Sequence, residues 1–308
     1  MKVLVTGGAG FLGSHLVSSL VNRSHDVVVL DNMHRGRLSH IEQVLWSNRV
    51  IFLPTDIRDY NAVSAAMEGV EIVYHLAAQS NVIGATQDPG YCFSTNVWGT
   101  FNVLKASAEA EVRRVVFASS REVYGEAYEL PVSEMAPLAA KNPYGASKVA
   151  GEAYCRMWQE GAGLDCMILR FANIYGPGDR DRVIPLWLSQ AWANQDLIIY
   201  GGAQVIDFLW VDYAVEAMLS AATCENEGPV NVGSGHGISI RDLSASLLWL
   251  TRSRSNVRYA PARRDEVVRF VADVRKMTKV LGVFPPKDPL EGLGVIAGDL
   301  GTRVEVRR

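Results

Sequence analysis

The strongest constraint on the fold is a glycine-rich turn between a buried strand and a helix at the start of the chain. Residues 3–5 are apolar and mostly β-branched, which is typical of a parallel strand buried on both faces. The glycines of "TGGAGFLG" follow, and Leu12, Leu16 and Leu20 then repeat every four residues along one predicted helical face. Residues 27–30 form a second apolar run. This strand–helix–strand unit predicts the start of a parallel α/β sheet.

The same alternation continues through the first half of the chain. The segments "VIFLPTD", "EIVYHLAA", "RRVVFASS" and "DCMILRFAN" are further predicted strands, separated by helical stretches. This pattern indicates the α/β class with a doubly wound parallel Rossmann sheet. Beyond about residue 171 it loosens into loops such as "NIYGPGDRDR", which predict a smaller interleaved C-terminal lobe over the carboxyl edge of the sheet. We assign residues 1–170, with 204–230 returning to them, to the sheet domain, and 171–203 with 231–308 to the lobe.

Composition narrows the class of protein. The chain has 308 residues, 48% of them hydrophobic and 20% charged, and a net charge of −3, which is typical of a globular protein and predicts neither nucleic acid nor an anionic membrane as partner. Its four cysteines are scattered without a CxxC pair, so we expect free thiols and no metal site. The apolar run in "MKVLVTGG" is too short for a signal peptide, and no run approaches the roughly 18 residues of a membrane helix. We expect a cytoplasmic protein.

The glycines predict a dinucleotide site. Gly7, Gly10 and Gly13 allow a tight turn, close approach of the backbone to a pyrophosphate, and close packing of helix on strand. The helix N-terminus then offers N–H groups to phosphates. Asp31 ends the second strand, where a carboxylate accepts hydrogen bonds from a ribose and repels a 2′-phosphate; this favours NAD, although Arg35 nearby favours NADP.

Two further residues support a catalytic prediction beside this site. Tyr144 and Lys148 are spaced i and i+4, so a helix places them on one face. A phenol is a poor base near neutral pH, and a lysine ammonium favours its ionised form. Ser120, at the end of a predicted strand, can hydrogen-bond the same substrate oxygen. The three predict removal of a proton from an alcohol while hydride passes to NAD.

The chain resembles the extended short-chain dehydrogenases/reductases that act on nucleotide sugars, and in particular UDP-glucose 4-epimerases. The motifs that carry the resemblance are "VTGGAGFLGSHLV", "LDN", "TDIRD", "HLAAQS", "NVWGT", "SSREVYGE", "NPYGASKVAGE", "RFANIYGPG" and "VNVGSG". The resemblance implies bound NAD in the sheet domain, a nucleotide sugar in the lobe, and a homodimer through helices around residues 97–108 and 146–158.

The resemblance also implies roles for individual residues. Ser120, Tyr144 and Lys148 form the catalytic set, Asn96 supports them, and Asp56 lies near the adenine amine unless it caps a helix. The cofactor residues are Gly7, Gly10, Phe11, Leu12, Gly13, Asp31, Asn32, Asp56, Ile57, Leu76, Ala77, Ala78, Asn96, Ser119, Tyr144, Lys148 and Phe171. The substrate residues are Ser120, Arg121, Glu122, Tyr144, Asn173, which contacts the diphosphate, and Arg263, for which Arg264 is the alternative.

One position departs from the pattern of the relatives. They carry a phosphate-binding arginine before the Asp-Phe/Tyr pair, whereas "YGGAQVIDFLWVD" has Ile206 in that place. Either Arg182 or Arg269 substitutes, or the nucleotide lies differently.

The residues after Ser120 discriminate between reactions. The 4,6-dehydratases of this family have an Asp-Glu pair there, and the Asp protonates the leaving hydroxyl. This chain has Arg121 before Glu122, and arginine is a poor general acid. We therefore predict 4-epimerisation of a UDP-hexose or UDP-hexuronate. The alternatives are UDP-glucuronate decarboxylation, for which Glu122 is retained, dehydration, and a non-catalytic NAD-binding sensor.

Two hypotheses account for Arg121. Its guanidinium could lie near carbon 6 and bind a carboxylate there, which would make the substrate a uronic acid such as UDP-glucuronate. Alternatively, Arg121 could point away and form a salt bridge with Glu126, Glu129 or Glu134.

Overall fold

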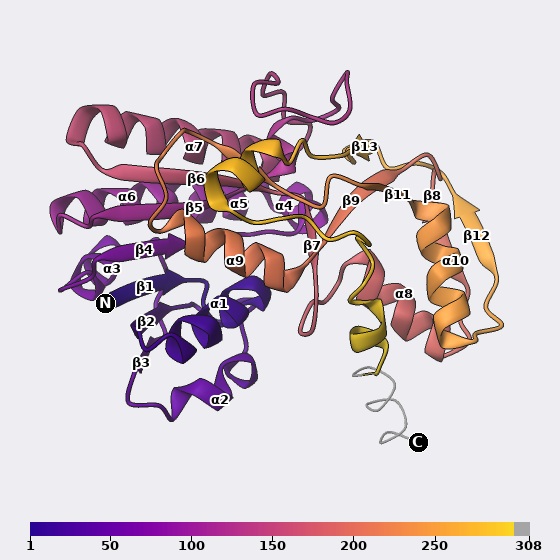
Figure 1. Ribbon diagram of the computed structural model, residues 1–308, viewed down its shortest axis with the longest axis horizontal. Coiled ribbons are helices and arrows are strands. Elements are labelled where there is room, and N and C mark those ends of the chain that lie inside the picture. The colour runs from indigo at the N-terminus through magenta and orange to yellow at the C-terminus, as the bar shows by residue number, and fades with distance from the viewer. Residues whose placement is uncertain (299–308) are drawn as a thin grey trace.

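Seven parallel strands form the central sheet of the computed structural model, which describes residues 1–298 (Figure 1). Their order is β3–β2–β1–β4–β5–β6–β10, so the direction in which strands are added reverses between β1 and β4. The carboxyl ends beside such a reversal form the crevice where ligands bind. The predicted strands and fold class are confirmed. The strands are β1 (Lys2–Thr6), β2 (Asp26–Leu30), β3 (Val50–Leu53), β4 (Ile72–His75), β5 (Arg114–Ser120), β6 (Asp165–Phe171) and β10 (Val230–Val232).

Helices cover both faces of this sheet because apolar side chains alternate along its strands. Val3 and Val5 pack in the cluster that includes the buried faces of α1 and α9, whereas Leu4 packs with α3, α6 and α7 on the other side. The helices of this part are α1 (Phe11–Asn22), α2 (Glu42–Leu45), α3 (Tyr60–Ala66), α4 (Val82–Gln87), α5 (Pro89–Phe93), α6 (Gly99–Glu109), α7 (Pro143–Ala162) and α9 (Val211–Ala221).

A smaller lobe lies at the carboxyl edge of the sheet, on the right in Figure 1. One small sheet pairs β9 (Val205–Trp210) with β7 (Asn173–Tyr175), β11 (Gly237–Ser239) and β13 (Arg269–Phe270). A second pairs β8 (Leu197–Tyr200) with β12 (Val257–Ala260). The helices α8 (Val183–Trp192) and α10 (Ile240–Thr251) contribute to the apolar cluster of this lobe.

The chain crosses between the two parts more than once. Within residues 204–230, β9 belongs to the lobe, while α9 packs on the large sheet, and β10 extends the sheet contribution to residue 232. The division into two domains at residues 170, 203 and 230 remains a prediction. The last ten residues assigned to the lobe, 299–308, lie outside the described residues.

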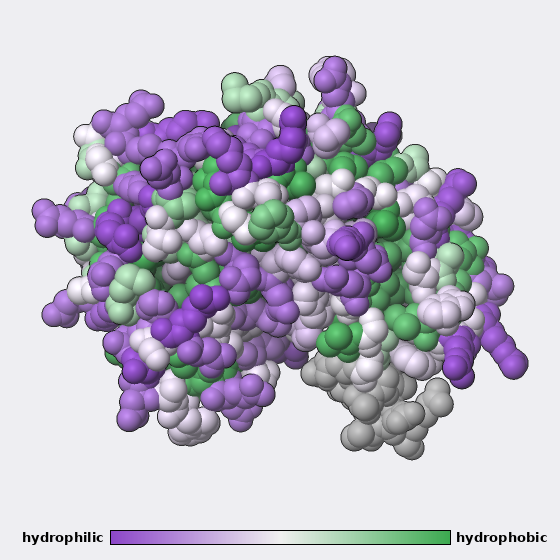
Figure 2. Space-filling view, viewed as in Figure 1, coloured by the Kyte–Doolittle hydropathy of each residue, from purple (hydrophilic) through white to green (hydrophobic). Residues whose placement is uncertain are grey.

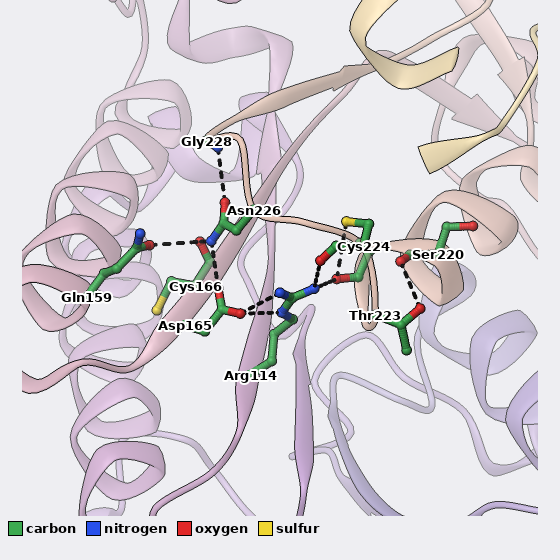
Figure 3. Close-up of polar contacts among 10 residues, drawn as sticks. Arg114, Gln159, Asp165, Cys166, Ser220, Thr223, Cys224, Asn226 and Gly228 are labelled. Atoms are coloured by element: carbon green, nitrogen blue, oxygen red, sulfur yellow. Dashed lines mark hydrogen bonds and ion pairs between the residues drawn. The ribbon is translucent and has the colours of Figure 1, made fainter. Parts of the chain in front are cut away.

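Arg114 ties the amino edge of the sheet to the end of α9 (Figure 3). Its Nε and Nη2 donate to Asp165 Oδ2 over 2.7 and 2.5 Å, and its Nη1 donates to the carbonyls of Ala221 and Cys224 over 2.8 and 2.7 Å. These carbonyls lie at the C-terminus of α9, where intrahelical donors are lacking. Asn226 Nδ2 completes the cluster through a 2.7 Å bond to Asp165 Oδ1.

We expect Arg114→Ala to lower the free energy of unfolding by about 3 kcal/mol, because removing one partner of a largely buried pair leaves the other polar groups unsatisfied. Urea titration followed by circular dichroism measures this. Arg113→Ala is the matched control, since Arg113 is exposed, and should change stability by about 0.5 kcal/mol or less. Equal stability of the two variants would contradict the assigned role of Arg114.

The remaining predictions on composition concern thiols, metals and surface. Cys92, Cys155 and Cys166 are buried, Cys224 is half-buried, and all four are free, as expected. Within residues 1–298 no group of three or more His, Cys, Asp or Glu side chains is placed to hold a metal, and no helix of this part is long and apolar enough to cross a membrane. Hydrophilic and hydrophobic residues are interspersed on the face shown in Figure 2.

Candidate active site

A cavity of about 1210 Å³ lies along the carboxyl edge of the large sheet and extends into the lobe. One end contains the glycine turn and the loop after β2, and the other end contains Tyr200, Arg263 and Arg264. Twenty of the predicted site residues line it. They are Gly7, Gly10, Phe11, Leu12, Gly13, Asp31, Asn32, Ile57, Leu76, Ala77, Ala78, Ser119, Ser120, Arg121, Glu122, Tyr144, Lys148, Phe171, Asn173 and Arg263.

The glycine turn forms a cradle that fits a dinucleotide. Gly7 has a φ of +71°, and a Cβ at Gly13 would lie 2.2 Å from the Gly7 carbonyl oxygen. Gly10 precedes α1 without a side chain that caps the helix, so the first N–H groups of α1 remain open to an anion. These features match the requirements of a bound pyrophosphate.

Asp31 is held rigidly beside this cradle. Its carboxylate accepts hydrogen bonds from the N–H groups of Ala9 (3.0 Å) and Met33 (2.9 Å). Burial raises the pKa of Asp31 above its ordinary value, and these N–H bonds act against that increase. Arg35 lines the same cavity, but its guanidinium lies 3.7 Å from the carboxylate of Asp181. The contact of Asp31 with a ribose stays a prediction.

Asp56 does not cap a helix. Asp59 caps α3 by accepting the Ala62 N–H, so the capping alternative for Asp56 is wrong. Asp56 instead accepts hydrogen bonds from Arg58 and Asn32, and the Arg58 hydrogen bond lowers the pKa of Asp56 to about 2. Within the described residues, Ile57 lines the cavity and its neighbour Asp56 does not.

The predicted catalytic residues lie on β5 and α7. Ser120 ends β5, and α7 begins after Asn142, which accepts the Gly145 N–H over 2.8 Å. This cap fixes the first turn, so that Tyr144 and Lys148 face the cavity one turn apart. Lys148 Nζ donates to the Ala118 carbonyl over 2.7 Å and lies 5.9 Å from the centre of the Tyr144 ring.

Burial dominates the protonation of both groups. It lowers the pKa of Lys148 to about 8, and it raises the pKa of Tyr144 to about 12. Hydrogen bonding to Ser120 and the charge of Arg182 act to lower the Tyr144 pKa, but they are weaker than the burial effect. The activation of the phenol therefore stays a prediction, because the groups around Tyr144 do not bring its pKa below the ordinary value.

The two adjacent serines have different partners. Ser119 Oγ donates to Glu152 Oε1 over 2.6 Å, and Glu152 forms a fully buried ion pair with Arg170 at 2.6 Å. Ser120 Oγ accepts the Glu122 N–H over 3.2 Å and faces Tyr144. The Ser119 hydroxyl is therefore held by the buried Glu152, whereas the Ser120 hydroxyl lies beside Tyr144.

Asn96 lies behind the cavity wall, in a π-helical turn, η2 (Ser94–Trp98). Its Nδ2 donates to Ser147 Oγ over 2.9 Å, and Ser147 Oγ donates to the Tyr144 carbonyl over 2.7 Å. Ser147 and Glu152 were not predicted, although both stand within "NPYGASKVAGE" at spacings that a helix turns inward. Asn96 is thus linked to the main chain of Tyr144 through Ser147, and its supporting role stays a prediction.

Arg121 forms its ion pair with its own neighbour. Its Nη2 lies 2.9 Å from Glu122 Oε1, and its guanidinium lies 5.8 Å from the centre of the Phe270 ring. Its Nη1 is buried without a hydrogen-bond partner among the described residues. The predicted alternative of a salt bridge to Glu126, Glu129 or Glu134 is therefore wrong: Glu126 accepts the N–H groups of residues 268 and 269, and Glu134 accepts the N–H of residue 231.

The lobe end of the cavity carries two exposed cations. The Arg263 guanidinium lies 3.9 Å from the centre of the Tyr200 ring, and Arg264 lines the cavity beside it. Ile206 stands on the wall as an apolar residue. Of its two predicted replacements, Arg182 lines the described cavity and Arg269 does not.

These features define the class of protein. A dinucleotide cradle joined to a Ser–Tyr–Lys set on a Rossmann sheet is the site of an extended short-chain dehydrogenase/reductase. The chain belongs to the NAD dependent epimerase/dehydratase family, whose model matches residues 3–233. NAD is the cofactor of this family.

Similar proteins share this architecture over almost the whole chain. A UDP-glucose 4-epimerase of Mycolicibacterium smegmatis is 34% identical and covers 95% of this chain and 96% of its own. A UDP-N-acetyl-alpha-D-glucosaminuronate decarboxylase of Bacillus cytotoxicus is 32% identical and covers 95% of each chain. The solved structure of MoeE5 in complex with UDP-glucuronic acid and NAD is 32% identical, with a TM-score of 0.89, and covers 99% of this chain and 100% of its own. The relatives therefore include both epimerases and decarboxylases of nucleotide sugars.

Proposed function

We propose that the chain catalyses NAD-dependent 4-epimerisation of a UDP-sugar. The observation that carries this proposal is the convergence of Ser120, Tyr144 and Lys148 on one cavity. The residue after Ser120 is Arg121, a cation that cannot act as a general acid. Reversible oxidation at carbon 4 needs only those three side chains and NAD.

The three side chains have distinct roles. Bound NAD supplies a hydride acceptor and donor at carbon 4 of the sugar. Tyr144 takes the proton of the 4-hydroxyl and returns it to the same oxygen after the sugar has presented its other face. The Lys148 ammonium stabilises the phenolate, and Ser120 holds the oxygen through a hydrogen bond. Arg263 and Arg264, which form no ion pair among the described residues, would hold the diphosphate.

Decarboxylation of a UDP-hexuronate is the second candidate. It is supported by Glu122 and by the decarboxylase among the relatives. Against it, both oxygens of Glu122 are already engaged, one by Arg121 at 2.9 Å and the other by Asn142 Nδ2 at 2.8 Å. A carboxylate in these contacts is poorly placed to take a proton from a sugar. A non-catalytic sensor would not require Tyr144 and Lys148 on the cavity wall.

A proton NMR time course separates these reactions. Purified protein without added NAD is mixed with UDP-glucose and UDP-glucuronate in one tube. We expect the 4-epimer of one or both sugars. Loss of carbon 6 as carbon dioxide would identify a decarboxylase, and no change in any nucleotide sugar would contradict the proposal.

The further proposal for the substrate is that Arg121 binds a carboxylate at carbon 6, as in UDP-glucuronate. Arg121 lines the cavity, its buried Nη1 has no hydrogen-bond partner among residues 1–298, and a guanidinium already paired on one side by Glu122 can still donate from the other. A substrate carboxylate would satisfy this donor.

We expect Arg121→Ala to lower kcat/KM for the uronate by about 10- to 100-fold, the range of a hydrogen bond to a charged group, and to change that for UDP-glucose by about threefold at most. Arg121→Lys keeps the charge beside Glu122 but not the guanidinium fork, so its loss should be smaller. Equal losses for both sugars would contradict the clamp. Separate assays on each nucleotide sugar provide the comparison.

We also propose a homodimer through α6 and α7, and a cytoplasmic location. Trp98 is 53% exposed and stacks on Phe101 at 5.5 Å, and Phe101 contacts Tyr154 and Trp158 of α7. Such an aromatic face is typical of an interface. Light scattering should give twice the chain mass, and Trp98→Asp should give the monomer; a wild-type monomer would contradict the dimer.

A further inference from the structure

A short segment of the lobe is fastened to the start of the catalytic helix. This segment, residues 261–268, connects β12 to β13 and is called the strap here. Asn142 Nδ2 donates to the Asp265 carbonyl over 3.2 Å, and Lys141 Nζ donates to the Glu266 carbonyl over 2.9 Å. Both donors immediately precede α7. The side chains of residues 141 and 142 therefore link the start of α7 to the main chain of the strap.

Asn142 joins three parts of the site through one buried side chain. Its Oδ1 caps α7 by accepting the Gly145 N–H over 2.8 Å. Its Nδ2 donates to Glu122 Oε2 over 2.8 Å as well as to the strap. Gly145 packs so closely that a Cβ there would lie 2.5 Å from the Glu122 carbonyl oxygen. A displacement of Asn142 would therefore be passed to the first turn of α7, where Tyr144 lies.

The strap is anchored at one end and open at the other. Val267 is buried among Val123 and Phe270, and Glu126 accepts the N–H groups of residues 268 and 269. Arg263 and Arg264, by contrast, are exposed on the cavity wall, where Arg263 stacks on the Tyr200 ring, and neither forms an ion pair within residues 1–298. A diphosphate in the cavity would attract these two cations and so act on the open end of the strap.

We propose that Asn142 is a positioning residue through which a nucleotide diphosphate held by the strap sets the alignment of Tyr144. The inference rests on the proposed function, because it assumes a nucleotide diphosphate in the lobe. It gives the non-reacting part of the substrate an effect on turnover as well as on affinity. Asn142 itself contacts Glu122, α7 and the strap, and acts on the reaction through Tyr144.

The test uses Asn142→Ser with UDP as the probe. Serine is an equally good helix cap, but its hydroxyl is too short to join Glu122 and the strap at the same time. We expect kcat to fall about tenfold, which corresponds to about 1.4 kcal/mol, while KM changes by about threefold at most and NAD remains bound. Asp59→Ser makes the same kind of cap exchange at α3, away from the cavity, and should leave kcat unchanged.

Hydrogen–deuterium exchange supplies a readout that does not depend on turnover. UDP is expected to slow exchange in the peptide that contains residues 143–147 of the wild type by about fivefold or more. In Asn142→Ser, UDP should still bind, as calorimetry would show, but exchange in that peptide should not change.

Two results would overturn the inference, and they differ. If UDP binds and slows exchange equally in wild type and Asn142→Ser, the coupling is absent while the proposed function stands. If the wild type binds neither UDP nor dTDP, the proposed function fails and the coupling with it.

Discussion

Replacement of Tyr144 by Phe is expected to lower turnover by about 10³- to 10⁴-fold and to leave NAD bound. The phenol is the only group of the predicted catalytic set that can carry the proton of the 4-hydroxyl, because the Ser120 hydroxyl is far less acidic and Lys148 Nζ is directed at the Ala118 carbonyl. The ring contributes packing that Phe retains. Initial rates by NMR and the NAD content of the purified variant measure the two effects.

Tyr154→Phe is the matched control for this variant. Tyr154 lies on the same helix, but its ring contacts Phe101, away from the cavity. The control should keep turnover within about twofold of wild type, since it removes an exchangeable hydroxyl without touching the site. A Tyr144→Phe variant that retained more than about a tenth of wild-type turnover would remove Tyr144 from the mechanism.

The sheet and the cofactor cradle could be predicted from the sequence because both follow from local rules. Apolar runs bounded by helical periodicity define buried parallel strands, and the glycine spacing around Gly7 and Gly13 follows from steric contacts between neighbouring residues. The spacing of Tyr144 and Lys148 is likewise a property of one helix. Each of these predictions depends on residues close together in the chain.

The partners of Arg121 and Asp56 could not be predicted in the same way. The short helix η3 (Arg121–Val123) turns Arg121 back on Glu122, so an ion pair forms between sequence neighbours, where the sequence suggested more distant glutamates. Asp56 faces Arg58 because α3 begins three residues later than a cap at Asp56 would require. Both outcomes depend on where a short helix begins, which local propensity does not determine.

The protonation of Tyr144 shows the limit of an argument from residue types. The sequence suggested that the Lys148 ammonium favours the phenolate, but burial in the cavity outweighs the groups that lower the pKa of Tyr144, the Ser120 hydroxyl and Arg182, and raises it to about 12. The contacts of Asn142 with the strap cross more than 120 residues of sequence and were not foreseen. Desolvation and long-range contacts depend on the whole fold.

The cost of burying Lys148 leads to the second large effect. Burial lowers the pKa of Lys148 from 10.5 to about 8. At pH 7 the group is protonated in both the folded and the unfolded chain, so the folded state carries the whole penalty of about 3 kcal/mol. Between pH 8 and 10.5 the unfolded chain binds more protons at this site than the folded chain, so stability rises with pH across that window.

Lys148→Met should therefore abolish turnover and stabilise the cofactor-free protein. Methionine fills a similar volume without a charge, which removes the penalty of burial, but it loses the 2.7 Å bond to the Ala118 carbonyl. We therefore expect the free energy of unfolding at pH 7 to rise by a net amount of about 1–3 kcal/mol. Because other groups titrate in the same range, the quantity to measure is the difference between variant and wild type in urea unfolding from pH 7 to 10. That difference should shrink as pH passes 8, when wild-type Lys148 loses its proton in the folded state. Lys105→Met, at a half-buried α6 lysine whose ammonium pairs with Glu109 near the surface, should show no such trend. A gain that is constant with pH would mean that packing, rather than the buried charge, separates the two proteins.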